Sequence, residues 1–328
     1  MKKPIIAITM GDASGIGPEL ITKVLSREEV YGYCNPFVIG DPNVMEEISR
    51  VMDGDLYFKA IRDISEADFR FANPDVLCPE GANIPEIRWG KLDPAMGKAA
   101  ALYLERASTL ALEKKIDGIV SAPLNKEAFH RAGYHYVDEL EYLAELTKSP
   151  EPFVMGLMDS VWTLPVTFHI PFRDIADMIK KERVLRYIRL MDETLRKMGL
   201  LEPKIAVAAL NVHGGEGGLF GREEIGEIKP AVEEAQKLNV KVQGPFPADT
   251  IFVRATDGEF HAVVCMYHDQ ANIARKLYAR RKGVTLFMGL PVPYGTTAHG
   301  TAFDIAGKGI ANPSSLQDSL KYTAILSS

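Results

Sequence analysis

Short apolar runs alternate with amphipathic segments along the whole chain. Between the runs, apolar residues return every three or four positions, which predicts helices, most clearly over Lys98–Lys114, Lys181–Met198 and Ile225–Leu238. This alternation predicts parallel strands joined by crossover helices in a layered α/β fold. The runs expected to form buried strands are Ile5–Met10, Phe37–Ile39, Val76–Leu77, Gly118–Ala122, Val161–Phe168, Ile205–Leu210, Ala262–Tyr267 and Val284–Gly289.

The length and composition are those of an ordinary globular protein. With 328 residues the chain exceeds what one core usually holds, so two lobes are expected. A net charge of -6 disfavours a nucleic-acid partner, and no apolar stretch approaches the roughly 20 residues that span a bilayer. Residues 1–10 lack a signal-peptide core, and Cys34, Cys78 and Cys265 are scattered as in proteins of reducing compartments. A cytoplasmic protein is therefore expected.

Three of the seven histidines directly follow predicted strands, in polar or glycine-rich surroundings. They are His169 in Thr-Phe-His, His213 in Asn-Val-His-Gly-Gly-Glu, and His268 in Tyr-His-Asp-Gln. Ligands bind at strand ends in open α/β sheets, and three neutral imidazoles suffice for a divalent transition metal. Each histidine alone also suits a structural, hydrogen-bonded role. Their shared context favours a metal site.

A glycine-rich turn, Gly11–Glu19, follows the first predicted strand and opens a helix, with Pro18 suited to its first turn. The helix start offers N–H groups to an anion. The GxGxxG spacing is absent, so a Rossmann cofactor site is not expected at this turn. Asp12 and Ser14 are instead expected to be turn and capping residues.

The stretch His299–Pro313 reads HGTAFDIAGKGIANP. It resembles the adenosine-binding loop of the isopropylmalate and isocitrate dehydrogenases, which bind a dinucleotide without a Rossmann fold. The resemblance places His299 and Asn312 near the adenine and Asp304 near the ribose. A carboxylate accepts hydrogen bonds from a ribose 2′-OH but repels a 2′-phosphate, so NAD is expected rather than NADP. The residues expected to bind the cofactor are His299, Gly300, Thr301, Ala302, Asp304 and Asn312.

Over the whole chain, the sequence resembles the 4-hydroxythreonine-4-phosphate dehydrogenase family, a branch of the same decarboxylating dehydrogenases. The matching pieces run from near residue 4 to near residue 317 and include GDASGIGPE, SAPLNK, NVHGGEGGLFGREE, PADT, YHDQ and HGTAFDIAGKG. The resemblance implies one divalent metal (zinc, or magnesium, manganese or cobalt) held by His169, His213 and His268. It further implies a homodimer with a shared active site, in which the other subunit supplies the third histidine.

The same resemblance implies a two-lobed α/β/α sandwich of the isocitrate and isopropylmalate dehydrogenase type. One lobe, on the cofactor side, is expected to comprise residues 1–127 and 272–328. The other, with the metal, substrate and dimer contacts, is expected to comprise residues 128–271.

Four positions depart from the family's substrate-binding pattern. Where the family reads Gly-His-Thr-Glu, this chain has Asp-Glu-Leu-Glu, so Glu139 and Leu140 replace histidine and threonine. The family's asparagine and arginine correspond to Thr285 and Tyr294, whereas Lys276 matches a family lysine. Losing an arginine fork weakens recognition of phosphate or carboxylate, and a new carboxylate repels an anion. The cations Arg275 and Arg280–Lys282 are a solvated face or a compensating anion site.

These features predict metal-dependent, NAD-linked oxidative decarboxylation of a small phosphorylated hydroxy acid, as in pyridoxal phosphate biosynthesis. Asp249 and Asp269 are candidate proton acceptors or supports for metal-bound imidazoles. Lys276 and Lys126 are candidates for substrate binding or proton donation. One alternative is a related dehydrogenase acting on threonate or erythronate 4-phosphate or on a dihydrodiol carboxylate. Another is a non-catalytic protein that binds NAD or a metabolite.

Overall fold

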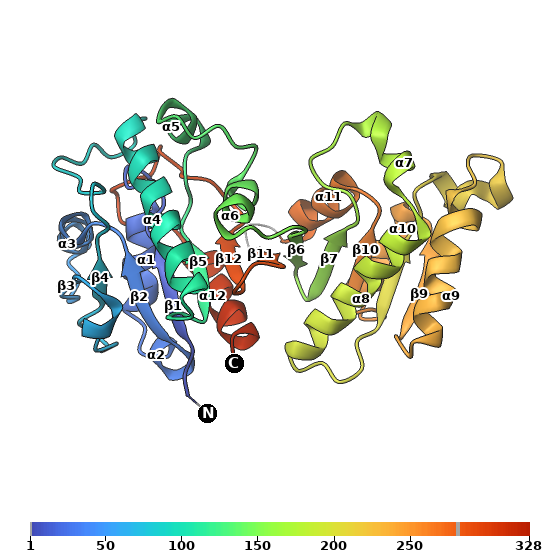
Figure 1. Ribbon diagram of the computed structural model, residues 1–328, viewed down its shortest axis with the longest axis horizontal. Coiled ribbons are helices and arrows are strands. Elements are labelled where there is room, and N and C mark those ends of the chain that lie inside the picture. The colour runs from blue at the N-terminus through green and yellow to red at the C-terminus, as the bar shows by residue number, and fades with distance from the viewer. Residues whose placement is uncertain (1, 280–282) are drawn as a thin grey trace. The chain divides into compact units, whose positions relative to one another are not determined.

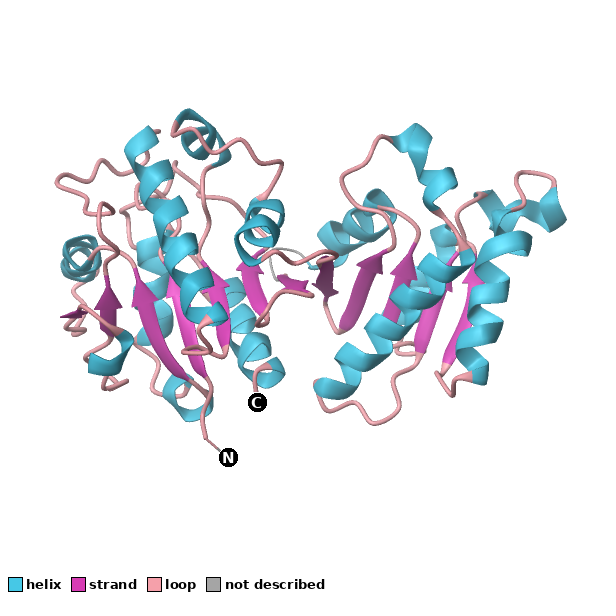
Figure 2. Ribbon diagram, viewed as in Figure 1, coloured by secondary structure: helices cyan, strands magenta, loops and turns pink. Residues whose placement is uncertain are grey.

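The computed structural model describes residues 2–279 and 283–328 and divides the chain into two compact units. The first comprises Met1–Phe153 and Val284–Ser328, and the second Val154–Gly283 (Figure 1). The charged run Arg280–Lys282 lies outside the described residues. In each unit, helices pack on both faces of a sheet (Figure 2), which confirms the layered α/β class.

The first unit is built on strands in the order β3-β4-β2-β1-β5-β12-β11. Neighbouring strands are parallel except β11 and β12, which are antiparallel. The strands are β1 (Ile5–Thr9), β2 (Asn35–Ile39), β3 (Lys59–Ile61), β4 (Asp75–Leu77), β5 (Gly118–Ser121), β11 (Val284–Met288) and β12 (Tyr294–Thr297). The helices are α1 (Gly17–Leu25), α2 (Val30–Tyr33), α3 (Pro42–Val51), η1 (Ile64–Glu66), α4 (Pro94–Leu112), α5 (Lys126–Arg131), α6 (Glu139–Thr147) and α12 (Ser314–Leu326).

The second unit has the strand order β6-β7-β10-β8-β9. Strands β7, β10 and β8 are adjacent and parallel, whereas β6 is antiparallel to β7. The strands are β6 (Phe153–Met158), β7 (Val161–Pro165), β8 (Ile205–Ala208), β9 (Val242–Phe246) and β10 (Ala262–Cys265). The helices are η2 (Phe172–Asp174), α7 (Ile175–Met178), α8 (Lys181–Lys197), η3 (Val212–Gly218), η4 (Glu224–Ile228), α9 (Lys229–Lys237), α10 (Ala248–Thr256) and α11 (His268–Ala279).

The central strands are buried on both faces because helices cover both sides of each sheet. Every residue of β5, β7, β8 and β10 is buried, which explains their unbroken apolar runs. All the predicted strands are present. Four further strands were not predicted: β3 and β12 contain few apolar residues, β9 holds a Gly-Pro pair, and the apolar β6 was overlooked. The prediction of parallel pairing is wrong for β6–β7 and β11–β12.

The predicted helices are also present, and none in the described ranges is both long and apolar enough to cross a membrane. The segment predicted over Ile225–Leu238 is divided into η4 and α9. At the start of α1, Asp12 Oδ1 accepts a hydrogen bond from the Ser14 backbone N at 2.9 Å, which is the expected role of a turn residue. Cys265 is fully buried, as expected of a small core residue.

The boundaries between the two units lie at residues 153/154 and 283/284. The boundaries predicted from the sequence were 127/128 and 271/272. Helices α5 and α6 pack against α4, and the Tyr142 hydroxyl of α6 donates to Glu105 Oε1 of α4 at 2.6 Å. At the other boundary, α11 packs on β7 and β10. These contacts assign α5 and α6 to the first unit and α11 to the second.

Candidate functional site

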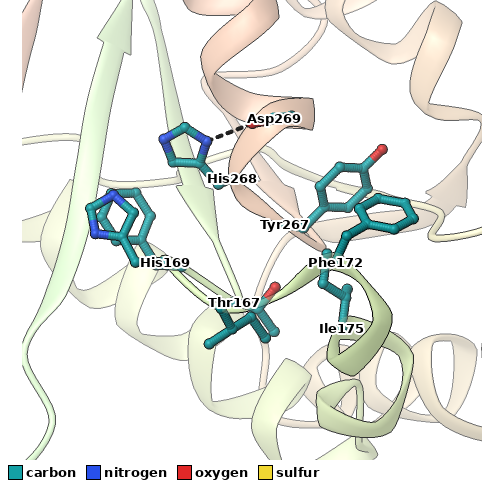
Figure 3. A pocket seen from close by; sticks show the side chains of 9 residues that line it. Thr167, His169, Phe172, Ile175, Tyr267, His268 and Asp269 are labelled. Carbon is teal, nitrogen blue, oxygen red and sulfur yellow. Dashed lines mark hydrogen bonds and ion pairs between the residues drawn. The ribbon is translucent and has the colours of Figure 1, made fainter. Parts of the chain in front are cut away.

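A pocket of about 170 Å³ lies where β7 and β10 end, in the second unit. His169 and His268 stand side by side in it, with ring centroids 5.6 Å apart (Figure 3). One chain therefore brings together two of the three predicted metal ligands. The lining residues are Thr167, Phe168, His169, Ile170, Phe172, Ile175, Tyr267, His268 and Asp269.

The orientation of the two imidazoles is fixed by their neighbours. His268 is the first residue of α11, and its Nδ1 lies 2.7 Å from Asp269 Oδ1. This contact leaves Nε2 as the ring nitrogen for a ligand, and a carboxylate on the other nitrogen is a frequent partner of metal-bound histidine. Phe168 packs against both rings, with its centroid 3.9 Å from that of His169 and 5.1 Å from that of His268.

Left-handed backbone conformations occur at two of the three histidines. The φ angle is 40° at His169 and 51° at His213, and Glu216 has 43°. Positive φ is uncommon for residues other than glycine and costs on the order of 1 kcal/mol or more at each position. Such conformations are retained where the surrounding structure imposes them, and they concentrate at functional sites.

The loop that carries His213 is held by the buried carboxylate of Glu224. This carboxylate accepts hydrogen bonds from the backbone N atoms of Leu210 and Asn211, each at 2.8 Å, and from Asn211 Nδ2 at 2.9 Å. A Cβ at Gly215 would lie 2.7 Å from Glu224 Oε2, so this position requires glycine. The sequence analysis did not identify Glu224 as a functional residue, although it ends the NVHGGEGGLFGREE motif.

Polar side chains tie the ends of β7, β10 and β8 together. The Thr167 hydroxyl donates to the Met266 carbonyl at 2.8 Å, and Gln270 Oε1 accepts from the Met266 backbone N at 2.8 Å. Gln270 Nε2 also donates to the carbonyl of Ala209, just past β8, at 2.8 Å. The three strand ends that precede the histidines are therefore held at one edge of the sheet. Thr167 and Gln270 are further residues that sequence reasoning missed.

His213 does not join the other two histidines within one chain. Its side chain is exposed and its Nδ1 lies 3.5 Å from Glu216 Oε1. Among residues 2–279 and 283–328, one chain assembles no group of three His, Cys, Asp or Glu side chains suited to a metal ion. A single copy of the chain thus offers two imidazoles of the predicted ligand set.

Two other predicted catalytic residues lie on helices of the same unit. Asp249 is exposed in the first turn of α10, and Lys276 is exposed in the last turn of α11. Because His268 starts α11, Lys276 lies about 12 Å further along the helix axis, at ~1.5 Å per residue. Asp269 is therefore the predicted catalytic residue that contacts the histidine pair directly.

In the first unit, two side chains of α1 hydrogen-bond to the backbone of the predicted cofactor loop. Glu19, which is fully buried, accepts hydrogen bonds from the backbone N atoms of Gly309 at 3.1 Å and Ala311 at 2.5 Å. Lys23 Nζ donates to the carbonyls of the same two residues at 2.9 and 2.7 Å, and it pairs with Glu19 at 2.7 Å. Neither Glu19 nor Lys23 was identified from sequence. The residues that they contact lie nearly 290 positions away in the sequence, so no local pattern indicates these contacts.

The predicted cofactor-binding residues divide into exposed and buried ones. Asp304, His299, Gly300 and Asn312 are exposed, and Asn312 Oδ1 accepts from the Ser314 backbone N at 3.0 Å. The others hold the loop in place. The Thr301 carbonyl accepts from the Ile16 backbone N at 3.0 Å, and Ala302 has a left-handed φ of 43°. The loop thus presents polar side chains from a rigid backbone.

The departures at the predicted substrate residues are joined in the first unit. The Tyr294 hydroxyl donates a hydrogen bond to Glu139 Oε1, although 155 positions separate them. Tyr294 is completely buried, and Leu140 and Thr285 are also buried. Burial raises the pKa of the Glu139 carboxyl to about 7, while hydrogen bonds with Tyr294 and Ser121 act in the opposite direction.

Comparison with known proteins identifies the family. The model of "Pyridoxal phosphate biosynthetic protein PdxA" matches residues 32–323. The chain is 42% identical over 323 residues to a "Putative D-threonate 4-phosphate dehydrogenase" of Halalkalibacterium halodurans, covering 98% of this chain and 97% of the relative. A 4-hydroxythreonine-4-phosphate dehydrogenase structure from Burkholderia phymatum has a TM-score of 0.83 and 40% identity, with 99% of both chains covered.

A more distant structure shares the same fold. It is a terephthalate 1,2-cis-dihydrodiol dehydrogenase from Burkholderia xenovorans LB400, with a TM-score of 0.69 and 25% identity over 99% of this chain and 98% of that chain. The relatives extend over nearly the whole sequence, and the family model matches residues 32–323, which include all the motifs described above except GDASGIGPE. The chain belongs to the family of the pyridoxal phosphate biosynthetic protein PdxA.

Proposed function

We propose that this protein is a dehydrogenase that uses NAD and a divalent metal to oxidise and decarboxylate a small hydroxy acid. The observation that carries the proposal is the pair formed by His169 and His268, with Asp269 orienting one ring. Family membership and the dehydrogenase names of the relatives support the reaction class.

The donor set fits a transition metal better than magnesium. Imidazole nitrogens suit zinc or cobalt, whereas magnesium and manganese favour oxygen ligands. Rings with centroids 5.6 Å apart allow both His169 and His268 to reach one ion at nitrogen–metal distances of about 2.0–2.1 Å. When bound, such an ion supplies a Lewis acid that lowers the pKa of a hydroxyl group and stabilises enolate charge after loss of CO2. His213 is the proposed third ligand.

The chain's own residues orient groups and move protons in this reaction. Asp269 holds the His268 ring so that Nε2 faces the ion. Asp249 is the proposed acceptor of the substrate hydroxyl proton, and its exposed position on α10 leaves it accessible. Lys276 is proposed to bind the substrate carboxylate or to return a proton to the product. Lys126 is a second, exposed candidate for substrate binding.

The cofactor is proposed to bind the loop His299–Asn312. The Asp304 carboxylate is exposed and is carried on a backbone fixed by Glu19 and Lys23. An acidic side chain beside the ribose accepts hydrogen bonds from its hydroxyls and repels a 2′-phosphate, so NAD is favoured over NADP.

A homodimer with a shared site is proposed because His213 lies among exposed apolar side chains. Val212, Leu219 and Phe220 are 57%, 75% and 49% exposed, and Ile225 is 44% exposed. Contiguous exposed apolar surface marks interaction sites. A two-fold dimer would cover this surface and bring a histidine of one subunit to the pair in the other.

Mixing inactive variants tests the shared site. His169→Ala, His213→Ala and His268→Ala proteins are purified separately, then mixed pairwise under conditions that permit verified subunit exchange. If one ligand crosses between subunits, activity returns in the two mixtures that contain the variant of that crossing ligand and not in the third. No recovery in any mixture contradicts the shared site.

The identity of the acid is tested by NADH formation with and without a chelator. The panel includes 4-hydroxythreonine 4-phosphate and threonate 4-phosphate, which appear in the names of the relatives. It also includes erythronate 4-phosphate, which resembles them. It also includes a dihydrodiol carboxylate and unphosphorylated hydroxy acids. Chelator-sensitive NADH formation with any of them supports the proposal. A non-catalytic binding protein would bind NAD in calorimetry but would form no NADH with any acid of the panel.

A further inference from the structure

Glu139 and Tyr294 form one buried polar unit in the first domain. The Tyr294 hydroxyl donates to Glu139 Oε1, and its ring stacks on Phe287 with centroids 5.2 Å apart and an interplanar angle of 8°. The buried Ser121 hydroxyl, at the end of β5, lies near the Glu139 carboxyl and lowers its pKa, and it donates a hydrogen bond to the Ala122 carbonyl at 2.9 Å. Two side chains that differ from the family pattern are thus in direct contact with each other.

Glu139, near Ser121 at the end of β5, lies where a ligand of an α/β sheet is expected, whereas Tyr294 begins β12 level with Ile119. Strand β12 runs parallel to β5, with Thr296 level with Ser121, and α6 begins at Glu139 (Figure 1). Ligands of such sheets bind beyond the carboxyl ends of the strands. Glu139 is half-buried, in contrast to Tyr294, so the carboxylate is the member that a ligand can approach.

The charge around the pair is unsuited to a phosphate. The first turn of α6 carries Glu139 and Glu141, and Asp138 caps the helix by accepting from the Glu141 backbone N at 2.9 Å. Glu141 Oε2 in turn accepts from the Val137 backbone N at 2.6 Å. These acidic side chains take the helix end that would otherwise favour an anion.

The cation Lys126 acts on Glu139 from nearby. Lys126 lowers the pKa of the carboxyl, and its Nζ donates to the Val137 carbonyl at 3.0 Å. One exposed lysine replaces neither the bidentate geometry nor the rigidity of a guanidinium for holding a phosphate.

A hydroxyl group, by contrast, fits the pair. A carboxylate has about four acceptor positions, and Tyr294 uses one of them. The remaining positions accept hydrogen bonds from an alcohol, which brings no charge to repel. A site built to hydrogen-bond a hydroxyl discriminates strongly against groups that cannot make that bond.

We propose that Glu139 and Tyr294 together determine specificity, and that the substrate presents an uncharged hydroxyl rather than a phosphate to Glu139. The inference rests on the proposed dehydrogenase function and names the substrate class for it. The enzyme would accordingly act on an unphosphorylated polyhydroxy acid.

The first test compares threonate with threonate 4-phosphate. For the wild-type protein with metal and NAD, kcat/KM for threonate is expected to exceed that for the phosphate by at least about 30-fold, the lower range of what an unpaired charge costs. The variant Glu139→His/Tyr294→Arg is expected to reverse the preference. Glu80→His, which makes the same charge change at an exposed acid elsewhere in the first unit, is the matched control and should leave the ratio unchanged.

A second measurement needs no turnover. Inorganic phosphate is titrated into wild type, Glu139→Gln and the double variant, and binding is followed by calorimetry. Because Tyr294 is fully buried and its replacement risks the fold, Glu139→Gln provides a variant that keeps the hydrogen bond from Tyr294 and loses only the charge. Phosphate binding is expected to strengthen by about ten-fold in Glu139→Gln.

The two measurements separate this inference from the proposed function. Wild-type turnover of threonate 4-phosphate at a rate equal to or above that of threonate overturns the hydroxyl assignment and leaves the dehydrogenase intact. If neither acid reduces NAD, the phosphate titration decides. Equal phosphate affinity in wild type and Glu139→Gln overturns the inference, whereas tighter binding in the variant supports it.

Discussion

The histidine pocket of the second unit and the Glu139–Tyr294 pair of the first unit satisfy their polar groups in opposite ways. In the pocket, the side chain of His268 is 41% exposed, and His169 is exposed on a left-handed backbone; outside the pocket, the side chain of His213 is 60% exposed. At the pair, a carboxyl group and a phenol hydrogen-bond each other, and the phenol has no exposed surface. The first arrangement exposes imidazole side chains, and the second supplies hydrogen-bonding partners of its own.

The difference indicates which part of the family's chemistry this chain preserves. Supporting residues such as Gln270 and Glu224 hold the histidine loops by hydrogen bonds to the backbone, so the whole framework of that site is intact. At the pair, substitutions at two distant positions have produced a new internal contact. The proposed metal site and the proposed substrate contact therefore differ in how their polar groups are satisfied, and the two are expected to respond very differently to mutation.

The largest expected effect is at the histidine pocket. Replacing His169 or His268 with alanine removes a nitrogen ligand that no nearby side chain replaces in kind, so kcat/KM is expected to fall by at least about 10³-fold, or roughly 4 kcal/mol. Metal content per subunit, measured by elemental analysis, should fall in parallel. His135→Ala, which removes an exposed histidine of the first unit, is the control. Stoichiometric metal and near-normal turnover in the pocket variants contradict the site.

The sequence was sufficient for the elements that a local pattern defines. Strands such as β7 and β10 are continuous apolar runs, and the histidines directly after them were correctly expected at strand ends. Contacts between distant segments were beyond it. The clamp of Glu19 on Gly309 and the bond between Tyr294 and Glu139 join residues 290 and 155 positions apart, and neither leaves a periodic trace in the sequence.

Strand β12 shows a second limit. Its residues Tyr294–Thr297 include two threonines and a glycine, so it carries no apolar run even though three of its four positions are buried. Its burial comes from neighbours in the sheet and from α12 rather than from its own composition. Hydrophobic pattern alone cannot identify such a strand. For the same reason, the sequence did not indicate that Tyr294 is buried.

An intermediate effect is expected at Asp304, a carboxylate that is exposed whereas Glu139 is half-buried. Repulsion between this group and a 2′-phosphate should favour NAD over NADP by about 100-fold in kcat/KM, equivalent to ~2.7 kcal/mol. Asp304→Asn keeps the shape and removes the charge, so the preference should narrow by about ten-fold. Glu80→Gln, at another exposed acid of the same unit, should leave the preference unchanged. Comparable kcat/KM for both cofactors in the wild type contradicts the placement of Asp304.

The last expected effect concerns stability at the Glu139–Tyr294 pair, because a half-buried, hydrogen-bonded carboxyl should influence stability more than an exposed one. Burial raises the pKa of Glu139 to about 7, with Asp138 adding to the rise and Tyr294, Ser121 and Lys126 opposing it.

In the unfolded chain the Glu139 pKa returns to about 4.3, so between pH 4.3 and 7 the folded protein binds more protons than the unfolded one. The contribution of Glu139 to stability is therefore full below about pH 4.3 and is lost as the pH rises to about 7, by at most on the order of 3 kcal/mol. Glu139→Gln keeps an acceptor for Tyr294 without ionising, so its free energy of unfolding from urea titrations should fall less between pH 5 and 8 than that of the wild type.

Asp12, whose buried carboxyl also has its pKa raised to about 7, contributes equally to both proteins and cancels in the comparison. Glu141 is an exposed residue in the same helical turn, and Glu141→Gln controls for the loss of a surface carboxylate. Identical pH profiles for wild type and Glu139→Gln would show that Glu139 is as open to solvent as the histidines, and the contrast between the two regions would fail.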